Sequence, residues 1–243
     1  MRRRRTIKIT FAVLALLLAG FTGFLGYIGY FGGPVYYDIA PARPTPPAAK
    51  GLAVVLVSGD MGFKIGMGPQ IARRFAADGI PVVGVSSLAY FRHQRTPAEV
   101  QALIADAARR ALAFGHADRL VMIGQSFGAD MMHVGLPALP ADLRAKVKIV
   151  ALVVPTDTVF FHASPSEMFN WVKPDAMGLP TGRQLTWVPA LCVQGAEEKD
   201  SLCPKLTQPN MRRVALPGGH GLHWDADGLY RTLHGAIADI TKI

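Results

Sequence analysis

Residues 119–128 read Arg-Leu-Val-Met-Ile-Gly-Gln-Ser-Phe-Gly, an apolar run followed at once by Gly124-x-Ser126-x-Gly128. The run predicts a buried strand, and residues 127–139 predict a helix. A serine between a strand and a helix, with a glycine two residues to each side, is typical of a sharp turn that exposes the hydroxyl at the carboxyl edge of a sheet. Glycines let the strand and the helix approach closely. This stretch therefore predicts a nucleophilic serine, Ser126, in a strand–turn–helix unit.

Apolar strands and amphipathic helices alternate on both sides of this unit. Each strand is apolar throughout, which is typical of a parallel sheet covered by helices on both faces. The predicted fold class is α/β, with a mostly parallel central sheet and three layers. The expected strands lie at residues 52–57, 81–85, 119–123, 147–154, 189–194 and 213–216, and the expected helices at residues 69–77, 96–115, 127–139 and 225–240.

Composition limits the class of protein further. Half of the 243 residues are apolar and 18% are charged, which excludes a disordered chain or a collagen-like repeat. Residues 51–243 are long enough for one domain with its own core. Of the net charge of +9, five positive charges come from residues 1–8. The rest of the chain has no basic stripe with interleaved aromatic residues, so we expect no binding to nucleic acid.

The N-terminal segment predicts a membrane anchor. Residues 9–37 contain no charged side chain, and residues 9–31 alone would extend about 34 Å as a helix at ~1.5 Å per residue. We expect a cytoplasmic basic segment at residues 1–8, a transmembrane anchor at residues 9–33 and the domain on the far side of the membrane. A cleaved signal peptide is the alternative, although its apolar region is normally shorter. The residues expected at the far interface are Tyr27, Tyr30, Phe31, Tyr36 and Tyr37.

Residues 34–50 separate this anchor from the domain. They contain five prolines and no apolar periodicity. This composition predicts an extended, polyproline-like linker. At ~3.1 Å per residue, residues 38–51 would reach about 43 Å.

The acid that would assist Ser126 is expected in the loop after the strand at residues 189–194. On this kind of fold the order along the chain is serine, acid, histidine. The loop offers three carboxylates, Glu197, Glu198 and Asp200. Glu198 stands three residues after Gly195, where the acid of such hydrolases normally falls, whereas Asp200 has the shorter and more commonly used side chain. Both remain candidates.

The base is expected in the loop after the last strand, where two glycines precede His220. His223 is the alternative. An oxyanion site needs two backbone donors, one of which is the N–H of the residue after the nucleophile, Phe127. The second is expected from Met61 or Gly62, in the glycine-rich loop that follows the first strand.

The two cysteines flank the acid loop. Cys192 lies in the strand before the loop and Cys203 lies at its end. We expect a disulfide between them that limits the movement of the acid, the alternative being two buried free thiols. The chain carries no metal-binding motif such as His-Glu-x-x-His or Cys-x-x-Cys, so we expect neither a metal nor a cofactor.

These motifs together resemble the bacterial virulence protein family that includes VirJ and AcvB, which are exported proteins of the α/β-hydrolase fold. The resemblance covers most of residues 52–242. This chain differs from the family at Met61 and Phe63, where the family has glycine and tryptophan, and at residues 221–224. The segments that carry it are Ser58-Gly59-Asp60-x-Gly62-Phe63, Ser87-Leu-Ala-Tyr90-Phe91 with Thr96-Pro97, Gly124-Gln-Ser126-Phe127-Gly128-Ala129-Asp130, Gly195-x-x-Glu198-x-Asp200-Ser201-x-Cys203 and Leu216-Pro-Gly-Gly-His220.

The resemblance implies a serine hydrolase without a cofactor, with Ser126 as nucleophile, His220 as base and Asp200 or Glu198 as acid. Members of the AcvB branch hydrolyse aminoacyl-phosphatidylglycerols in the periplasm. The implied substrate is therefore a lysyl or alanyl ester of this phospholipid, cleaved by a domain that faces the periplasm from the inner membrane. The amine of such an ester could meet Asp60 or Asp130, both of which are alternatively helix caps.

Two other functions fit the same residues. VirJ is connected with type IV secretion, so the chain could be a binding protein for secretion-system proteins, and a generic carboxylesterase would need only the catalytic residues. Residues 156–184 form an irregular insertion. Its aromatic and methionine side chains are expected to form a lid or an interfacial patch over the site, or else to close the core; they are Phe160, Phe161, Met168, Phe169 and Trp171.

Overall fold

A computed structural model describes residues 2–164 and 172–243 of the chain. Its main feature is a seven-stranded sheet in which every neighbouring pair is parallel except β1 with β3. The strand order is β1-β3-β2-β4-β5-β8-β9. The strands are β1 (Tyr36–Ile39), β2 (Leu52–Val57), β3 (Val82–Val85), β4 (Arg119–Gln125), β5 (Val147–Val153), β8 (Ala190–Gly195) and β9 (Met211–Leu216).

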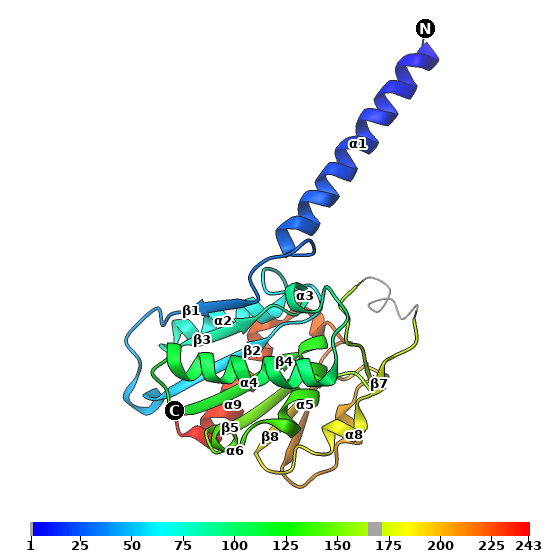
Figure 1. The fold of residues 1–243 in the computed structure, drawn as a ribbon. Helices are drawn as coiled ribbons and strands as arrows, with labels where there is room; N and C mark the ends of the chain where they lie inside the picture. The colour runs from blue at the N-terminus through cyan, green and yellow to red at the C-terminus, as the bar shows by residue number, and fades with distance from the viewer. Residues whose placement is uncertain (1, 165–171) are drawn as a thin grey trace.

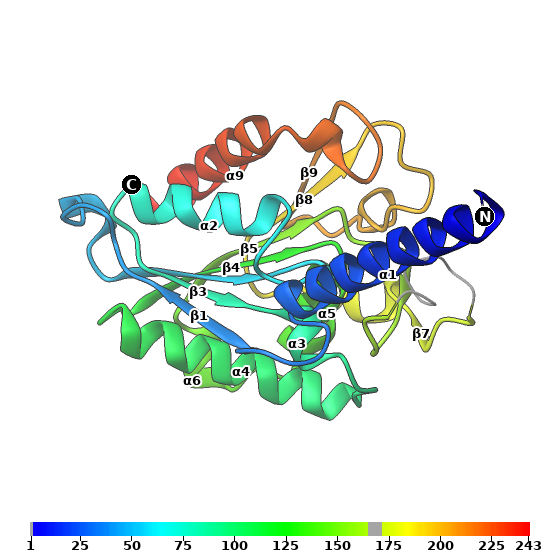
Figure 2. The ribbon, with the colours of Figure 1, turned by 90° about the horizontal axis from the view of Figure 1, so that it is seen from above.

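Helices cover both faces of this sheet. Figure 2 shows α2 and α9 on one side of it and α4 and α6 on the other. The predicted three-layer α/β class is confirmed. The helices are α1 (Arg2–Ile28), α2 (Met67–Ala77), α3 (Ser87–Tyr90), α4 (Pro97–Phe114), α5 (Phe127–Gly135), α6 (Ala141–Arg144), α8 (Leu179–Gly182) and α9 (Ala226–Thr241).

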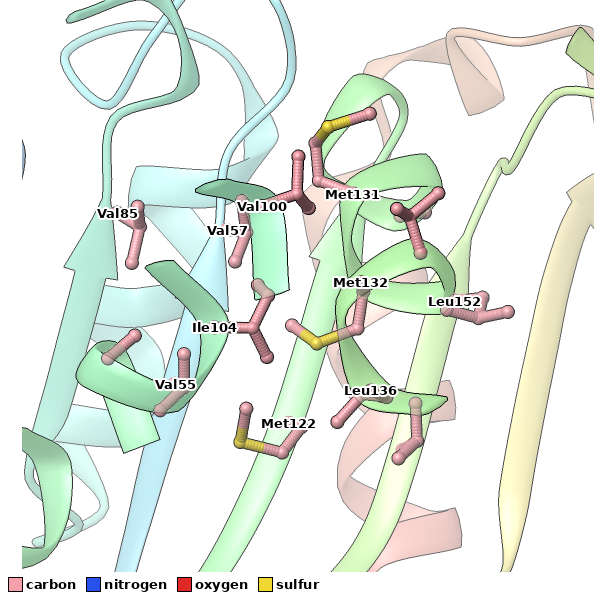
Figure 3. Packing of buried hydrophobic residues seen from close by; sticks show 14 of the residues in the cluster. Val55, Val57, Val85, Val100, Ile104, Met122, Met131, Met132, Leu136 and Leu152 are labelled. Carbon is pink, nitrogen blue, oxygen red and sulfur yellow. The ribbon is translucent and has the colours of Figure 1, made fainter. Parts of the chain in front are cut away.

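The strands are apolar throughout because each strand contributes to two cores. Alternate residues of β2 point to opposite faces: Val55 and Val57 belong to the core under α4 and α5, whereas Val54 and Leu56 belong to the core under α2 and α9. Figure 3 shows the first of these cores. All of the residues of β2 are fully buried. The site at the sheet edge is therefore built on a rigid support.

The predicted start of one helix is confirmed, whereas another helix is shorter than predicted. The capping box of α4 is present: Thr96 Oγ1 accepts the N–H of Glu99, and Glu99 Oε2 accepts the N–H of Thr96 at 2.8 Å. The helix expected at residues 127–139 ends at Gly135 and continues as a 3₁₀ turn, Leu136–Ala138. Pro137 lies in this turn, and a proline has no N–H with which to extend the α-helical pattern.

The prediction of a free linker at residues 34–50 is wrong. Strand β1 lies inside this segment and pairs antiparallel with β3 at the edge of the sheet. Arg110 of α4 binds both carboxylate oxygens of Asp38, at 2.8 and 2.7 Å. The N–H of Ala42 donates to the carbonyl of Ala76. Proline content alone did not reveal these contacts, since one short strand without proline is enough to attach the segment to the sheet.

The tyrosines of β1 also lie elsewhere than predicted. Tyr36 and Tyr37 are in the sheet rather than at a membrane interface. The Tyr36 hydroxyl donates to Asp106 at 2.6 Å, and Tyr37 stacks on Phe63. Of the expected interfacial aromatic residues, Tyr27 and Phe31 remain largely exposed.

Helix α1 extends away from the domain, with its last turn above α3 (Figure 1). Its segment Lys8–Ile28 is long and apolar enough to cross a membrane, or to serve as a signal sequence. The helix ends five residues before the predicted boundary at residue 33. Gly29 and Gly32 then adopt positive φ angles and turn the chain toward β1.

The described part of the insertion at residues 156–184 contributes both to the core and to the wall of the cavity at Ser126. Phe161 is buried in the core, whereas Phe160 lines the cavity beside Ser126. A two-stranded sheet of β6 (Thr158–Val159) and β7 (Ala176–Met177) holds the described parts together. The predictions for Met168, Phe169 and Trp171 lie outside the described residues.

Candidate active site

Ser126 occupies a strained turn between β4 and α5. Its backbone angles are φ 52° and ψ −125°, a region that residues with a side chain rarely adopt. The two flanking glycines permit the turn by close approach. A Cβ on Gly124 would lie 2.3 Å from the carbonyl oxygen of Gly128, and a Cβ on Gly128 would lie 2.3 Å from that of Val57. The turn therefore has the geometry that the motif predicts.

His220 and Glu198 complete a hydrogen-bonded chain with this serine. Ser126 Oγ lies 2.7 Å from His220 Nε2, and His220 Nδ1 lies 2.6 Å from Glu198 Oε1. The other carboxylate oxygen, Glu198 Oε2, accepts the N–H of Gly195 at 3.1 Å. The arrangement is that of a nucleophile, a base and an acid that orients the base.

The structure separates the two candidate acids. The side chain of Glu198 is only 1% exposed and contacts His220 directly. Asp200 lines the same cavity and influences His220 only through its charge. The backbone carbonyl of Asp200 accepts the N–H of Asp157 at 2.9 Å. His223, the alternative base, lies in the 3₁₀ turn Leu222–Trp224, and it is His220 whose ring contacts Ser126.

The environment of His220 makes it a stronger base than a free histidine. The hydrogen bond that His220 donates to Glu198 raises the pKa of His220, and the negative charges of Glu198, Asp130 and Asp200 raise it further. Partial burial opposes this change because it disfavours the charged imidazolium. A raised pKa suits a residue that must accept a proton from a hydroxyl.

Of the predicted oxyanion donors, the N–H of Phe127 is well placed, whereas other candidate N–H groups already have acceptors. Phe127 is the first residue of α5, so its N–H has no acceptor within the helix and lies where the helix dipole favours negative charge. The N–H of Gly62 instead donates to the carbonyl of Gly59 at 3.1 Å. This turn argues against Gly62 as the second donor. Met61 is the other candidate, but its N–H also has an acceptor, the carboxylate of Asp60, so the described contacts favour neither residue as the second donor.

Asp60 lines the same cavity as Ser126 and His220. It is largely buried, and this burial raises the pKa of its carboxyl group. The positive charge of His220 and the N–H groups of Met61 and of Asp60 itself lower the pKa, but only in part. Asp60 is therefore a carboxylate held close to the reacting groups in a poorly solvated place, where charges interact strongly.

Asp130 also faces the cavity, but its carboxylate has partners inside the protein. Thr156 donates to it from its N–H at 3.0 Å and from its hydroxyl at 2.9 Å. His133 Nε2 lies 3.6 Å away. Burial raises the pKa of Asp130. Sequence reasoning did not identify Thr156, since a threonine in an irregular segment carries no signal of such a contact.

A cavity of about 360 Å³ opens beside Ser126 and His220. Three carboxylates line it, those of Asp60, Asp130 and Asp200, and no lysine or arginine does among the residues that the structure describes. A second cavity of about 280 Å³ lies on the other side of Ser126 and is bounded by Met61 and by the exposed Trp224. The first cavity suits a group with positive charge.

The predicted disulfide is present. Cys192 in β8 and Cys203 are bonded, with their Cα atoms 5.5 Å apart. The bond closes the segment that carries Glu198. It thereby limits how far the acid can move from the histidine.

Solved structures with the same arrangement of strands and helices include several esterases. Est1E from Butyrivibrio proteoclasticus superposes with a TM-score of 0.58 at 13% sequence identity, covering 84% of this chain and 94% of that one. A lipase-esterase related protein from Clostridium acetobutylicum gives 0.59 at 11% identity, covering 84% and 100%. An esterase from Pyrococcus furiosus gives 0.55 at 13% identity, covering 87% and 94%. At these identities the likeness establishes the fold, which is that of the α/β-hydrolases.

A search of curated protein sequences finds no match. The family model described as "Bacterial virulence protein (VirJ)" matches residues 51–241, which is most of the chain. With the α/β-hydrolase fold and the Ser126–His220–Glu198 arrangement, this match identifies the chain as a member of the VirJ family of bacterial virulence proteins.

Proposed function

We propose that this protein is a membrane-anchored serine esterase of the periplasm that hydrolyses the aminoacyl ester of phosphatidylglycerol. The observation that carries the proposal is the cavity at Ser126, which is lined by three aspartates and, among the residues that the structure describes, by no lysine or arginine. An aminoacyl ester has a cationic amine close to its carbonyl carbon. A cavity with this charge favours such an ester over neutral or anionic esters.

The reaction would proceed in two steps. Ser126 Oγ attacks the aminoacyl carbonyl while His220 Nε2 takes the hydroxyl proton, and the N–H of Phe127 stabilises the oxyanion. The ester oxygen leaves as the hydroxyl of phosphatidylglycerol with the proton from His220. A water molecule, deprotonated by His220, then attacks the aminoacyl-serine. His220 returns this proton to Ser126 Oγ as the acyl–oxygen bond breaks, and the free amino acid leaves. Glu198 holds the imidazole in position and stabilises its charged form.

Two features support the proposed location. The basic residues before the apolar helix favour a cytoplasmic N-terminus, which places the domain on the opposite side of the membrane. The Cys192–Cys203 disulfide favours an oxidising compartment. The segment Lys8–Ile28 would then be an uncleaved anchor.

The amine is proposed to meet Asp60 rather than Asp130. Both oxygens of Asp130 already accept hydrogen bonds from Thr156. Asp60 interacts electrostatically with His220 and lines both of the cavities that include Ser126. Asp130 is then a positioning residue that holds Thr156 in the cavity wall.

The experiment uses the full-length protein in detergent with lysyl- and alanyl-phosphatidylglycerol, and thin-layer chromatography detects the lipid products. We expect hydrolysis by the wild type and its loss in Ser126→Ala. N-acetylated alanyl-phosphatidylglycerol, which has no positive charge, should be a much poorer substrate. Full activity in Ser126→Ala would overturn the mechanism. If the acetylated lipid and p-nitrophenyl acetate were hydrolysed as fast as alanyl-phosphatidylglycerol, the protein would be a generic carboxylesterase.

A further inference from the structure

A third cavity, of about 300 Å³, lies between the end of α1 and the domain. This volume is at the lower end of those that hold small ligands, ~300–1,000 Å³. One wall belongs to the apolar helix and the other to the loops beside the active site. The side chains that define the two walls are Phe21, Phe24, Leu25 and Ile28 from α1, and Met61 and Leu88 from the domain.

The end of α1 is fixed against the domain. Ile28 is only 5% exposed and is part of the domain core. Arg92 donates to the carbonyl of Phe31 at 3.0 Å, and the N–H of Ser86 donates to the carbonyl of Val35 at 2.8 Å. The ammonium group of Lys64 lies 4.9 Å from the centre of the Tyr27 ring. These contacts hold the helix and the domain in one orientation, so the cavity between them is a formed site.

The cavity adjoins the catalytic groups. Asp60 lines this cavity and also both cavities beside Ser126. Met61, one of the predicted oxyanion donors, lines it as well. A molecule that occupied it would therefore extend from the surface of α1 to Asp60, which also lines the cavities at Ser126.

The position of α1 relative to the membrane indicates what kind of molecule the cavity would hold. Phe21 and Phe24 lie within the candidate membrane span Lys8–Ile28. Phe21 is about 10 Å from Ile28 along the helix axis at ~1.5 Å per residue. This wall therefore lies in the outer part of the bilayer, where acyl chains are the abundant apolar groups. The other end of the cavity, at Asp60, is polar.

We propose that this cavity holds the glycerol backbone and the first part of an acyl chain of a membrane phospholipid, so that α1 forms one wall of the substrate site. The inference rests on the proposed function and extends it. The head group reaches Ser126 while the acyl chain stays beside Phe21 and Phe24. The lipid then needs to leave the bilayer only in part, because the apolar chain exchanges bilayer contacts for contacts with α1 and Leu88.

The first test measures binding without catalysis. Full-length Ser126→Ala is placed in phosphatidylglycerol vesicles that contain a small fraction of phosphatidylglycerol with a diazirine near the acyl carbonyl. After irradiation, mass spectrometry locates the attached lipid. We expect attachment at Met61 or Leu88, which belong to the domain. Attachment confined to α1 would overturn the proposal, since any membrane helix contacts acyl chains.

The second test compares Phe24→Ala with Phe11→Ala. Phe11 is an exposed phenylalanine of α1 outside the cavity, so its substitution removes the same group elsewhere on the helix. We measure kcat/KM for alanyl-phosphatidylglycerol divided by kcat/KM for p-nitrophenyl acetate. Phe24→Ala should lower this ratio about fivefold, the effect of losing roughly half of the contact of a buried phenylalanine. Phe11→Ala should leave the ratio unchanged, and equal ratios in the two variants would contradict the proposal.

The two proposals fail in different ways. If the wild type does not hydrolyse aminoacyl-phosphatidylglycerol, the proposed reaction is wrong, and the attachment experiment still decides whether the cavity binds phospholipid. If the lipid is hydrolysed but attachment is confined to α1, the reaction stands and the lipid approaches the serine by another route.

Discussion

The imidazole of His220 is held by Glu198 at 2.6 Å, and the same carboxylate is itself fixed by the N–H of Gly195. Because Glu198 is buried, the pair is shielded from solvent on the side of the acid. The histidine ring consequently presents Nε2 to Ser126.

Substitution of Glu198 should impair the reaction far more than substitution of Asp200. Glu198→Gln removes the charge that orients and stabilises the imidazolium. We expect kcat for p-nitrophenyl acetate to fall on the order of 10²- to 10⁴-fold. Asp200→Asn, tested with the same neutral ester, should cause a much smaller decrease. A larger decrease for Asp200→Asn would instead identify Asp200 as the acid.

The pH dependence of the reaction should report His220. The base must be neutral, so kcat/KM falls as the pH decreases through the pKa of His220, which Glu198 raises. In Glu198→Gln this cause is absent, and the acidic limb of the residual activity should move to lower pH. Asp200→Asn should move it in the same direction by less, since Asp200 also raises the pKa. A limb at the same pH in all three proteins would show that another group titrates.

Asp60→Asn should stabilise the fold while it weakens catalysis. Burial raises the pKa of Asp60, so its charged form destabilises the folded state at a pH above the folded pKa. Asparagine removes this cost, and the free energy of unfolding at pH 7 should increase. The gain should disappear as the pH falls through the pKa of Asp60, where the wild-type carboxyl is already neutral. Urea denaturation of the wild type and of Asp60→Asn at several pH values measures this gain in the free energy of unfolding.

The same variant tests the amine contact. A hydrogen bond to a charged group contributes about 1.5–3 kcal/mol, so kcat/KM for alanyl-phosphatidylglycerol should fall about 10- to 100-fold in Asp60→Asn. Its activity toward N-acetylated alanyl-phosphatidylglycerol relative to the alanyl lipid should rise. An unchanged preference for the cationic lipid would exclude Asp60 as the contact of the amine.

Removal of the disulfide should affect both stability and activity. Its loop spans a sequence separation of 11 residues, for which closure contributes about 2–3 kcal/mol. Cys192→Ala/Cys203→Ala should lower the free energy of unfolding by this amount in urea denaturation. Because the loop carries Glu198, kcat should also decrease, even at urea concentrations below the denaturation midpoint, where the protein is still folded. Dithiothreitol should reproduce both effects in the wild type and neither in the double variant.

Two glycine substitutions should have opposite effects. In Gly128→Ala the new Cβ would lie 2.3 Å from the carbonyl oxygen of Val57. This overlap should destabilise the protein by about 1–3 kcal/mol and displace Ser126. A Cβ on Gly235, in α9, would meet no atom within 4 Å beyond the backbone of its own helix, so Gly235→Ala should stabilise the protein by about 0.5–1 kcal/mol. Thermal unfolding followed by fluorescence compares the two, and a stable, active Gly128→Ala would contradict the close-approach argument.

Much of the fold was predictable because its signals are local. The strand at residues 119–125 is apolar on both faces, and the Thr96–Glu99 capping box marks the start of α4. The motif around Ser126 requires glycine at two positions for steric reasons, so it is visible in the sequence. The order of serine, acid and histidine along the chain follows from the order of the parallel strands.

Other features depended on contacts between distant segments. Two carboxylates in one loop have nearly the same sequence context, and only the packing of the loop against Gly195 and His220 distinguishes Glu198 from Asp200. Strand β1 is short and surrounded by prolines, so its pairing with β3 had no strong local signal. The helical spacing of Phe21, Phe24, Leu25 and Ile28 does not stand out either, because a membrane helix is apolar on all sides.

Sequence patterns alone were enough to predict the α/β class, the turn at Ser126, the long apolar helix at the N-terminus and the residues available for the site. The tertiary structure decided which acid contacts the base, that residues 36–39 join the sheet, and that the end of α1 forms a cavity beside Asp60. The difference lies in the distance along the chain over which the interactions act. Apolar periodicity and turn sterics act between neighbours in the chain, whereas the selection of Glu198 and the docking of α1 are set by packing between segments far apart in sequence.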